Sequence, residues 1–228
     1  MQTAKITAID RIRTTTDGEG VTTLVVFASC PLRCAYCINP FTWDTDINKF
    51  KDMSVEQLYN ELKIDSLYFL ATGGGICFGG GEPLLNHSFI REFIDTYKEE
   101  GWKYNMETSL SVKREFLDDV INDIDHFFVD SKDMDKNRYE LYTKGNYDLF
   151  YENLMYLKDT IGPERITVRV PIIPEFHKHE EYKENAELLK SLGFKHIQVF
   201  HYVIPETRKK ISQKAIDNKN EFLAKIKE

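Results

Sequence analysis

Short apolar runs alternate with longer amphipathic segments along most of this 228-residue chain. A short apolar run bounded by turn residues predicts a buried strand, and apolar residues three and four positions apart predict a helix. These patterns place strands at 24–28, 76–78, 102–106, 125–130, 166–174 and 196–202, and helices at 54–62, 88–99, 114–123, 135–142, 149–160, 180–192 and 212–227. Six strands that alternate with helices predict an α/β fold with a parallel sheet and helical crossovers.

The segments around this core carry weaker signals. Residues 6–12 alternate apolar and polar side chains, which is typical of an edge strand. Residues 17–20 read D-G-E-G and predict a tight turn before the first parallel strand. Residues 41–52 are polar, and we expect them to be irregular. Ser54 is a predicted N-cap, and Gln57 stands three positions later as in a capping box.

Composition narrows the class of protein. An apolar content of 42% with 13% aromatic residues indicates a globular protein, and the length suits one substantial domain or at most two small ones. The formal net charge of −7 argues against a nucleic-acid surface, which needs clustered Lys and Arg. The first residues lack an apolar signal-peptide core, and no stretch is long enough to span a bilayer. We therefore expect a cytoplasmic protein that binds neither nucleic acid nor membrane.

Three cysteines, Cys30, Cys34 and Cys37, follow the strand predicted at 24–28 with the spacing C-x3-C-x2-C. Three thiolates on one loop can hold three corners of a [4Fe–4S] cube and leave the fourth iron open to a small molecule. A structural zinc site is an alternative, but it wants four ligands, and no fourth one follows at zinc-like spacing. A disulfide framework fits badly because only Cys77 remains, and we expect Cys77 to be buried in a strand rather than a fourth ligand.

The cysteine spacing resembles the signature of the radical S-adenosylmethionine (SAM) superfamily, and Tyr36 matches the aromatic residue usual before the third cysteine. Residues 37–43 read C-x-N-P-x-T-W, which is similar to glycyl-radical-enzyme activases, the group typified by pyruvate formate-lyase activating enzyme. The resemblance implies a partial (β/α)6 barrel with parallel strands. It also implies one [4Fe–4S] cluster and S-adenosylmethionine as cofactors, in a single domain over 1–228 without a ferredoxin-like insert. A solvent-accessible cluster implies an anaerobic setting.

Residues 80–83 read G-G-E-P directly after the strand predicted at 76–78, and this resembles a second motif of the superfamily. Glycines let a backbone approach a ligand closely, and a carboxylate can pair with an ammonium group. The resemblance implies that Gly80, Gly81 and Glu82 meet the methionine part of the cofactor.

Two further strand ends resemble the activase pattern. Glu107 and Thr108 fall at an acidic residue followed by threonine, and the resemblance implies that both face the cofactor. Asp130 and Lys132 fit a D-x-K pattern, and alternate positions of a strand point to the same side. They could bind the amino and carboxylate groups of the cofactor, or a monovalent cation beside the carboxylate.

The later strands supply the last candidates. Arg169 matches an arginine that reaches the carboxylate end of the cofactor in the family, a role that suits its bidentate fork. His201 is the nearest counterpart of a histidine that family members carry at the end of this strand near the adenosine, although it lies about two residues early in the alignment. One departure stands out, because residues 17–22 read D-G-E-G-V-T where activases usually read D-G-P-G-I-R. This weakens the assignment to a specific activase but not to the superfamily.

Three classes of function follow from these observations. The first is a radical SAM oxidoreductase that cleaves S-adenosylmethionine reductively and abstracts hydrogen from a glycine of a partner glycyl radical enzyme. Such an enzyme takes its electron from flavodoxin or ferredoxin, and we expect a monomer. The second is a radical enzyme that modifies a ribosomal peptide or small molecule, of the epimerase or deazapurine-synthase type, which the altered 17–22 turn keeps open. The third is a non-enzymatic metal-binding module.

Overall fold

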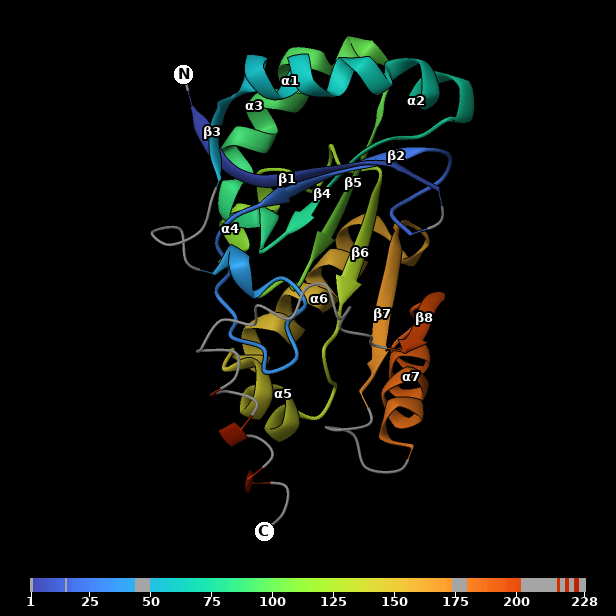
Figure 1. The fold of residues 1–228 in the computed structure, drawn as a ribbon. Helices are drawn as coiled ribbons and strands as arrows, with labels where there is room; N and C mark the ends of the chain where they lie inside the picture. Colours follow the sequence, from blue (N-terminus) through green and yellow to red (C-terminus); the bar gives the residue numbers. More distant parts are fainter. Residues whose placement is uncertain are drawn as a thin grey trace.

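One curved sheet organises the chain. The structure is a computed structural model that describes residues 2–14, 16–43, 50–173, 180–201, 217, 220, 221, 224 and 225. Within them, eight strands form a sheet in the order β3-β1-β2-β4-β5-β6-β7-β8 (Figure 1). The strands are β1 (Thr3–Arg13), β2 (Thr22–Phe27), β3 (Lys51–Ser54), β4 (Gly75–Gly80), β5 (Lys103–Thr108), β6 (His126–Asp130), β7 (Ile166–Ile172) and β8 (His196–His201).

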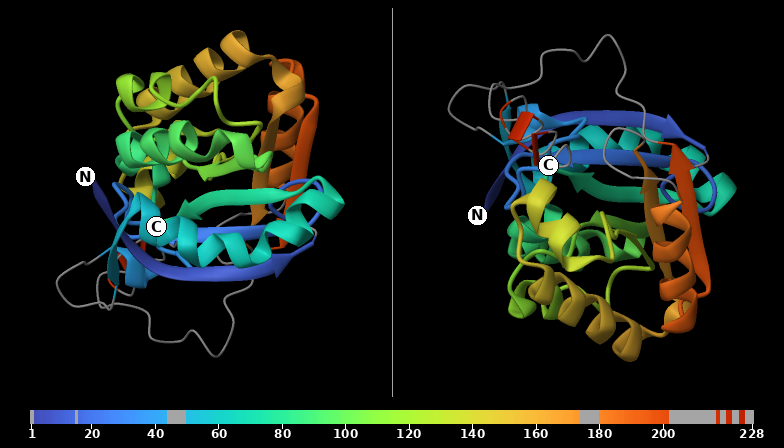
Figure 2. Two further views of the ribbon diagram at one scale, coloured as in Figure 1. Left: turned by 90° about the horizontal axis from the view of Figure 1, so that it is seen from above. Right: turned by 90° about the horizontal axis from the view of Figure 1, so that it is seen from below.

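Six neighbouring strands of this sheet are parallel, from β2 through β4, β5, β6 and β7 to β8. The α-helices are α1 (Val55–Leu62), α2 (Ser66–Thr72), α3 (His87–Tyr97), α4 (Arg114–Asp118), α5 (Lys136–Thr143), α6 (Tyr147–Ile161) and α7 (Glu181–Ser191). Seen from above and from below the view of Figure 1, the sheet curves so that β1 and β2 lie along one side and β7 and β8 along another (Figure 2). The prediction of a partial (β/α)6 barrel with parallel strands is confirmed.

Strand alternation divides the core from the concave face of the sheet. Tyr104 and Met106 of β5 are buried in the main apolar cluster together with residues of α3 and α6. Asn105 and Glu107, at the intervening positions, make polar contacts on the other side. Successive side chains of a strand point to opposite faces, so one strand supplies both the core and the concave face.

Helix α1 begins as the sequence predicts. The Ser54 hydroxyl accepts a hydrogen bond from the Gln57 amide at 3.2 Å, and the Gln57 side chain accepts one from the Ser54 amide at 2.9 Å. This capping box satisfies two backbone donors that have no partner within the helix.

The prediction of an edge strand at 6–12 holds beyond Ile6, because β3 covers the outer side of β1 only from Thr3 to Ile6. Two predictions about the fold need correction. The region 41–52 was expected to be irregular; its last residues instead belong to β3, a short strand whose Lys51 and Asp52 are exposed, so no apolar alternation marks it. Helix α4 ends at Asp118 rather than at 123. The helix predicted at 212–227 lies largely outside the described residues.

A bulge interrupts β1 near its end. Asp10 pairs with Leu24 and Arg13 pairs with Thr22, so two residues of β1 stand opposite one residue of β2. Within the bulge Ile12 has a φ of 57°, a left-handed conformation that is rare for a β-branched residue. An extra residue reverses the alternation of the strand beyond it. Arg13 therefore points to the same face as Asp10.

Replacement of Ser54 by Ala tests the cap of α1. We expect the free energy of unfolding to fall by about 1 kcal/mol, because the Gln57 amide loses its acceptor at the start of the helix. Urea denaturation followed by circular dichroism measures the change. An unchanged midpoint would show that solvent replaces the cap at no cost. Ser54→Thr, which keeps the hydroxyl, serves as the control.

Candidate active site

A cavity of about 680 Å³ lies on the concave face, where the parallel strands end. The cysteine loop after β2 forms one side of it, and residues of β1, β2, β5, β6, β7 and β8, with the end of β4, form the rest. The structure brings eleven of the thirteen predicted site residues to this cavity: Cys30, Cys34, Tyr36, Cys37, Gly80, Gly81, Glu107, Thr108, Asp130, Lys132 and Arg169. The volume is in the range of small-molecule and cofactor sites.

Backbone hydrogen bonds anchor the cysteine loop to the end of α5. The Arg33 amide donates to the Thr143 carbonyl at 2.7 Å and the Ala35 amide to the Tyr142 carbonyl at 2.8 Å, which ties the loop to α5. Tyr36 is buried and its ring stands edge-on to that of Tyr142 with centroids 5.1 Å apart. Hydrogen bonds and ring packing thus fix the loop.

The three sulfurs of the loop have the chemistry of cluster ligands. Burial raises the pKa of the Cys30, Cys34 and Cys37 thiols to about 12, so each is protonated near neutral pH until a metal displaces the proton. In the described part of the chain, no three His, Cys, Asp or Glu side chains converge closely enough to hold a single metal ion. All three cysteines line the same cavity, and thiolates are the ligands that iron–sulfur clusters take.

Cys77 does not belong to this set. It is fully buried within β4 and does not line the cavity. Burial also raises the pKa of its thiol well above the usual value. The expectation of a buried strand residue is confirmed.

The two glycines of the G-G-E-P motif let the end of β4 pass against the start of the cysteine loop. The Gly81 amide donates to the Phe27 carbonyl at 3.0 Å, and a Cβ on Gly81 would lie 2.1 Å from the Ser29 carbonyl oxygen. Gly80 has a φ of +105°, which a residue with a side chain rarely adopts. Close approach of two backbones therefore requires glycine here, whatever ligand the cavity takes.

Glu82 lies beneath the cavity rather than in it. Its carboxylate is fully buried and accepts hydrogen bonds from the Leu84 amide, the Thr108 hydroxyl, and the Ser109 amide and hydroxyl, at distances of 2.5 to 3.3 Å. Burial raises the pKa of Glu82, while these donors favour its charged form. The Glu82 oxygens thus hold the ends of β4 and β5 together, and a direct contact of Glu82 with the cofactor stays a prediction.

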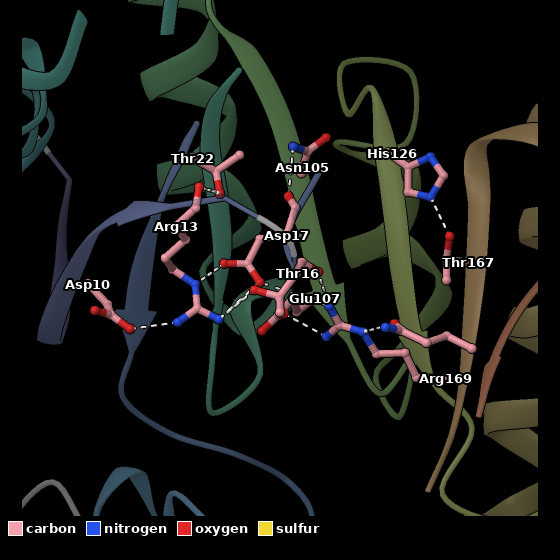
Figure 3. A network of polar contacts seen from close by, with 11 residues as sticks. Asp10, Arg13, Thr16, Asp17, Thr22, Asn105, Glu107, His126, Thr167 and Arg169 are labelled. Carbon is pink, nitrogen blue, oxygen red and sulfur yellow. Dashed lines mark hydrogen bonds and ion pairs between the residues drawn. The ribbon is translucent and has the colours of Figure 1, made fainter. Parts of the chain in front are cut away.

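Glu107 and Arg169 form an ion pair on the cavity floor. Arg169 Nη1 donates to Glu107 Oε1 at 2.6 Å, and Nη2 donates to the Thr16 carbonyl at 2.5 Å (Figure 3). Burial raises the pKa of Glu107, although Arg169 opposes that shift. Asp17 lies beside this pair, 4.0 Å from Arg169 Nη2. The turn before β2 therefore reaches across the concave face to β7.

A second ion pair joins Asp130 to Lys132 at 2.7 Å. Burial opposes ionisation of Asp130, but Lys132 and Arg169 together lower its pKa. The geometry differs from the strand alternation that the sequence predicts, because β6 ends at Asp130 and Lys132 has a left-handed φ of 61°. The chain turns back there and brings both side chains to the cavity.

His201 is the other predicted residue that the structure does not bring to the site. It is exposed on β8, where Gln198 and Phe200 line the cavity. Alternation along a strand turns His201 away from Phe200 and so away from the cavity. A place for His201 near the adenosine stays a prediction that the cavity does not support.

Sequence reasoning missed several cavity residues. Arg13, Thr16, Ser109, Gln198 and Phe200 all line the cavity. On β8, sequence reasoning chose His201 because it matches a family position, and so it passed over Gln198 and Phe200. The orientation of Arg13 depends on a bulge that leaves no signal in the sequence. Ser109 follows directly on the predicted pair at 107 and 108, which could have drawn attention to it.

Comparison with known proteins agrees with this site. The sequence profile of the Radical SAM superfamily matches residues 24–180, from β2 through the cysteine loop to the start of α7. The chain belongs to the radical SAM superfamily. Members of this superfamily are enzymes that use an iron–sulfur cluster and S-adenosylmethionine, and the three-cysteine loop beside a polar cavity fits both groups.

The curated relatives of this radical SAM protein include activating enzymes. The 4-hydroxyphenylacetate decarboxylase activating enzyme of Clostridioides difficile strain 630 is 28% identical, over 72% of this chain and 71% of that enzyme. The pyruvate formate-lyase-activating enzyme of Clostridium pasteurianum is 29% identical, over 77% of this chain and 72% of that enzyme. The solved structure of Streptococcus suis SuiB bound to S-adenosylmethionine matches the fold with a TM-score of 0.59 and 14% identity, over 89% of this chain and 48% of SuiB.

Replacement of Glu82 by Gln separates a structural role from a ligand role. An amide nitrogen cannot accept from Ser109, so we expect the free energy of unfolding to fall by roughly 1–3 kcal/mol in protein without cluster or cofactor. Thermal unfolding of anoxic apoprotein measures the change. Glu61→Gln, at a half-exposed surface carboxylate, is the control. Wild-type stability of the apoprotein combined with weaker cofactor binding would return Glu82 to the ligand set.

Proposed function

We propose that this radical SAM enzyme activates a glycyl radical enzyme by abstracting a hydrogen atom from a glycine of that partner. The observation that carries the proposal is that curated relatives matched over more than two thirds of this chain are activating enzymes. The C-x-N-P-x-T-W run at 37–43 adds a local feature of the same group.

The cavity holds the groups that the proposed cofactors require. Cys30, Cys34 and Cys37 would hold the [4Fe–4S] cluster after losing their protons. When bound, the cluster and S-adenosylmethionine supply a 5′-deoxyadenosyl radical, which is the hydrogen-abstracting species. The protein itself supplies binding, orientation and exclusion of water.

Charged side chains on the opposite wall suit the methionine part of S-adenosylmethionine. Lys132 and Arg169 can pair with its carboxylate, and Asp130 and Glu107 with its ammonium group, because each lines the cavity. Tyr36, Thr108 and the backbone at Gly80 and Gly81 complete the proposed binding set. Each acidic residue is paired with a cation already. A monovalent cation beside the carboxylate stays a prediction, and these two pairs reduce the need for one.

The open side of the barrel suits entry of a peptide. Among the described residues the sheet ends at β3 and β8 and does not close on itself. A glycine loop of a partner enzyme could reach the cavity through such an opening, which a sealed barrel would block. Modification of a ribosomal peptide or a small molecule is the alternative outcome of the test below.

Other features of the proposal concern the setting of the protein. We propose a monomer that receives its electron from flavodoxin or ferredoxin, in an anaerobic cytoplasm. A single domain over residues 1–228, without a ferredoxin-like insert, is part of the same proposal. None of the helices in the described segments has the length and apolar character that crossing a membrane requires.

Single replacement of Cys30, Cys34 or Cys37 by Ala tests the cluster ligands. We expect loss of cluster iron and of reductive S-adenosylmethionine cleavage, because two thiolates do not hold the cube. Iron analysis and measurement of 5′-deoxyadenosine after anoxic reconstitution report the two effects. Cys77→Ala is the matched control and should keep its iron. Bound zinc in place of iron, or full turnover of a variant, would contradict the assignment.

Co-expression with a glycyl radical enzyme tests the reaction. A doublet electron paramagnetic resonance signal of a glycyl radical should appear on the partner only when this chain, S-adenosylmethionine and a reductant are all present. Substitution of the partner's radical glycine by Ala should remove the signal. Production of 5′-deoxyadenosine with peptides or small molecules, and no radical on any glycyl radical enzyme encoded nearby, would favour the alternative.

A further inference from the structure

The bulge in β1 has a consequence for the cavity. Beyond the bulge, Arg13 joins Ala8 and Asp10 on the face that lines the cavity. Without the extra residue, regular alternation would send Arg13 to the side of Arg11. Arg11 points the other way and pairs with Asp65 at 2.7 Å and Glu61 at 3.1 Å. A left-handed β-branched residue such as Ile12 costs on the order of 1–3 kcal/mol, and such strain gathers at functional sites.

Arg13 uses its position to hold the turn before β2. Its Nε and Nη2 both donate to the Asp17 carboxylate, Nη2 donates to the Thr16 hydroxyl at 2.9 Å, and Nη1 donates to Asp10 at 2.6 Å (Figure 3). Asp17 is fully buried and its carbonyl accepts from the Asn105 side chain at 2.9 Å. A buried carboxylate is costly unless it is paired, and the two-point contact of a guanidinium is the strongest such pair.

The turn that Arg13 holds is also the support of Arg169. The Thr16 carbonyl accepts from Arg169, and Asp17 lies 4.0 Å from the same guanidinium. Arg169 in turn pairs with Glu107. The floor of the cavity is thus a row of alternating charges in the order Arg13, Asp17, Arg169 and Glu107. Removal of the first cation would leave the buried Asp17 and the partly buried Glu107 to compete for one guanidinium.

The cross-strand partner of Arg13 is Thr22. Thr22 occupies the last position of the D-G-E-G-V-T stretch, the place at which the activase pattern D-G-P-G-I-R carries arginine. Leu24 and Val26 of the same strand line the cavity, so alternation also directs Thr22 toward that face. Arg13 on β1 therefore lies directly opposite Thr22 on β2, which is the position where the activase pattern carries arginine.

We propose that Arg13 is a positioning residue of the cavity, which holds Asp17 and through it fixes Arg169 and Glu107 for binding the methionine part of S-adenosylmethionine. The bulge at Ile12 aims this guanidinium at the cavity. The inference rests on the proposed binding of that cofactor at Arg169, but not on the identity of the partner enzyme.

The test compares three variants after anoxic reconstitution of the cluster. Arg13→Gln removes the charge, Arg13→Gln with Thr22→Arg returns a guanidinium from the neighbouring strand, and Arg11→Gln is the matched control on the opposite face. Equilibrium dialysis measures the dissociation constant for S-adenosylmethionine. The perturbation of the reduced-cluster electron paramagnetic resonance spectrum by S-adenosylmethionine gives a second readout. Thermal unfolding reports stability.

We expect Arg13→Gln to weaken binding by about tenfold, which corresponds to about 1.4 kcal/mol. The double variant should recover most of that loss, and Arg11→Gln should bind as the wild type does even if its midpoint falls. Unchanged affinity in Arg13→Gln, equal weakening in Arg11→Gln, or no recovery in the double variant would each overturn the proposal. Binding is measured without a partner protein, so a failed search for a glycyl radical would leave this result standing.

Discussion

A buried carboxylate with four hydrogen-bond donors holds the active-site end of this barrel together. Glu82 joins the exit of β4 to the exit of β5, and its own amide donates to the Ser29 carbonyl at the start of the cysteine loop at 2.8 Å. Three strand ends are thereby fixed relative to one another by one residue. The positions of the sulfurs, the glycines and Thr108 around the cavity all depend on that junction, which is why an ionisable group is kept in a place that water does not reach.

Charge is arranged in pairs on the rest of the cavity surface. Arg169 with Glu107, and Lys132 with Asp130, give the cavity both signs within a small space while its wall stays close to neutral. A zwitterionic ligand such as an amino acid finds complementary partners for both of its charged groups there. A cavity wall with unpaired charges of one sign would instead attract counterions from solvent into the site.

Sequence patterns predicted the parallel strands, the capping box and the cysteine loop well, because local composition determines each of them. Prediction failed where a long-range contact decides the outcome. Glu82 belongs to a motif typical of ligand contact, and only the fold shows that its carboxylate oxygens accept hydrogen bonds from Thr108 and Ser109. Arg13 reads as one more polar residue of an alternating strand, since a bulge that reverses the alternation leaves no mark in hydrophobicity. The short strand β3 lacks any apolar run because it borders solvent.

The contact between Thr16 and Arg169 joins residues 153 positions apart in the chain. Non-local contacts of this kind carry a loop-closure entropy cost that local contacts do not. Asp17 and Glu107, both placed before β6 in the chain, therefore acquire the guanidinium that lies between them only when β7 takes its place in the sheet. The polar floor of the cavity is completed by one of the last strands of the described chain.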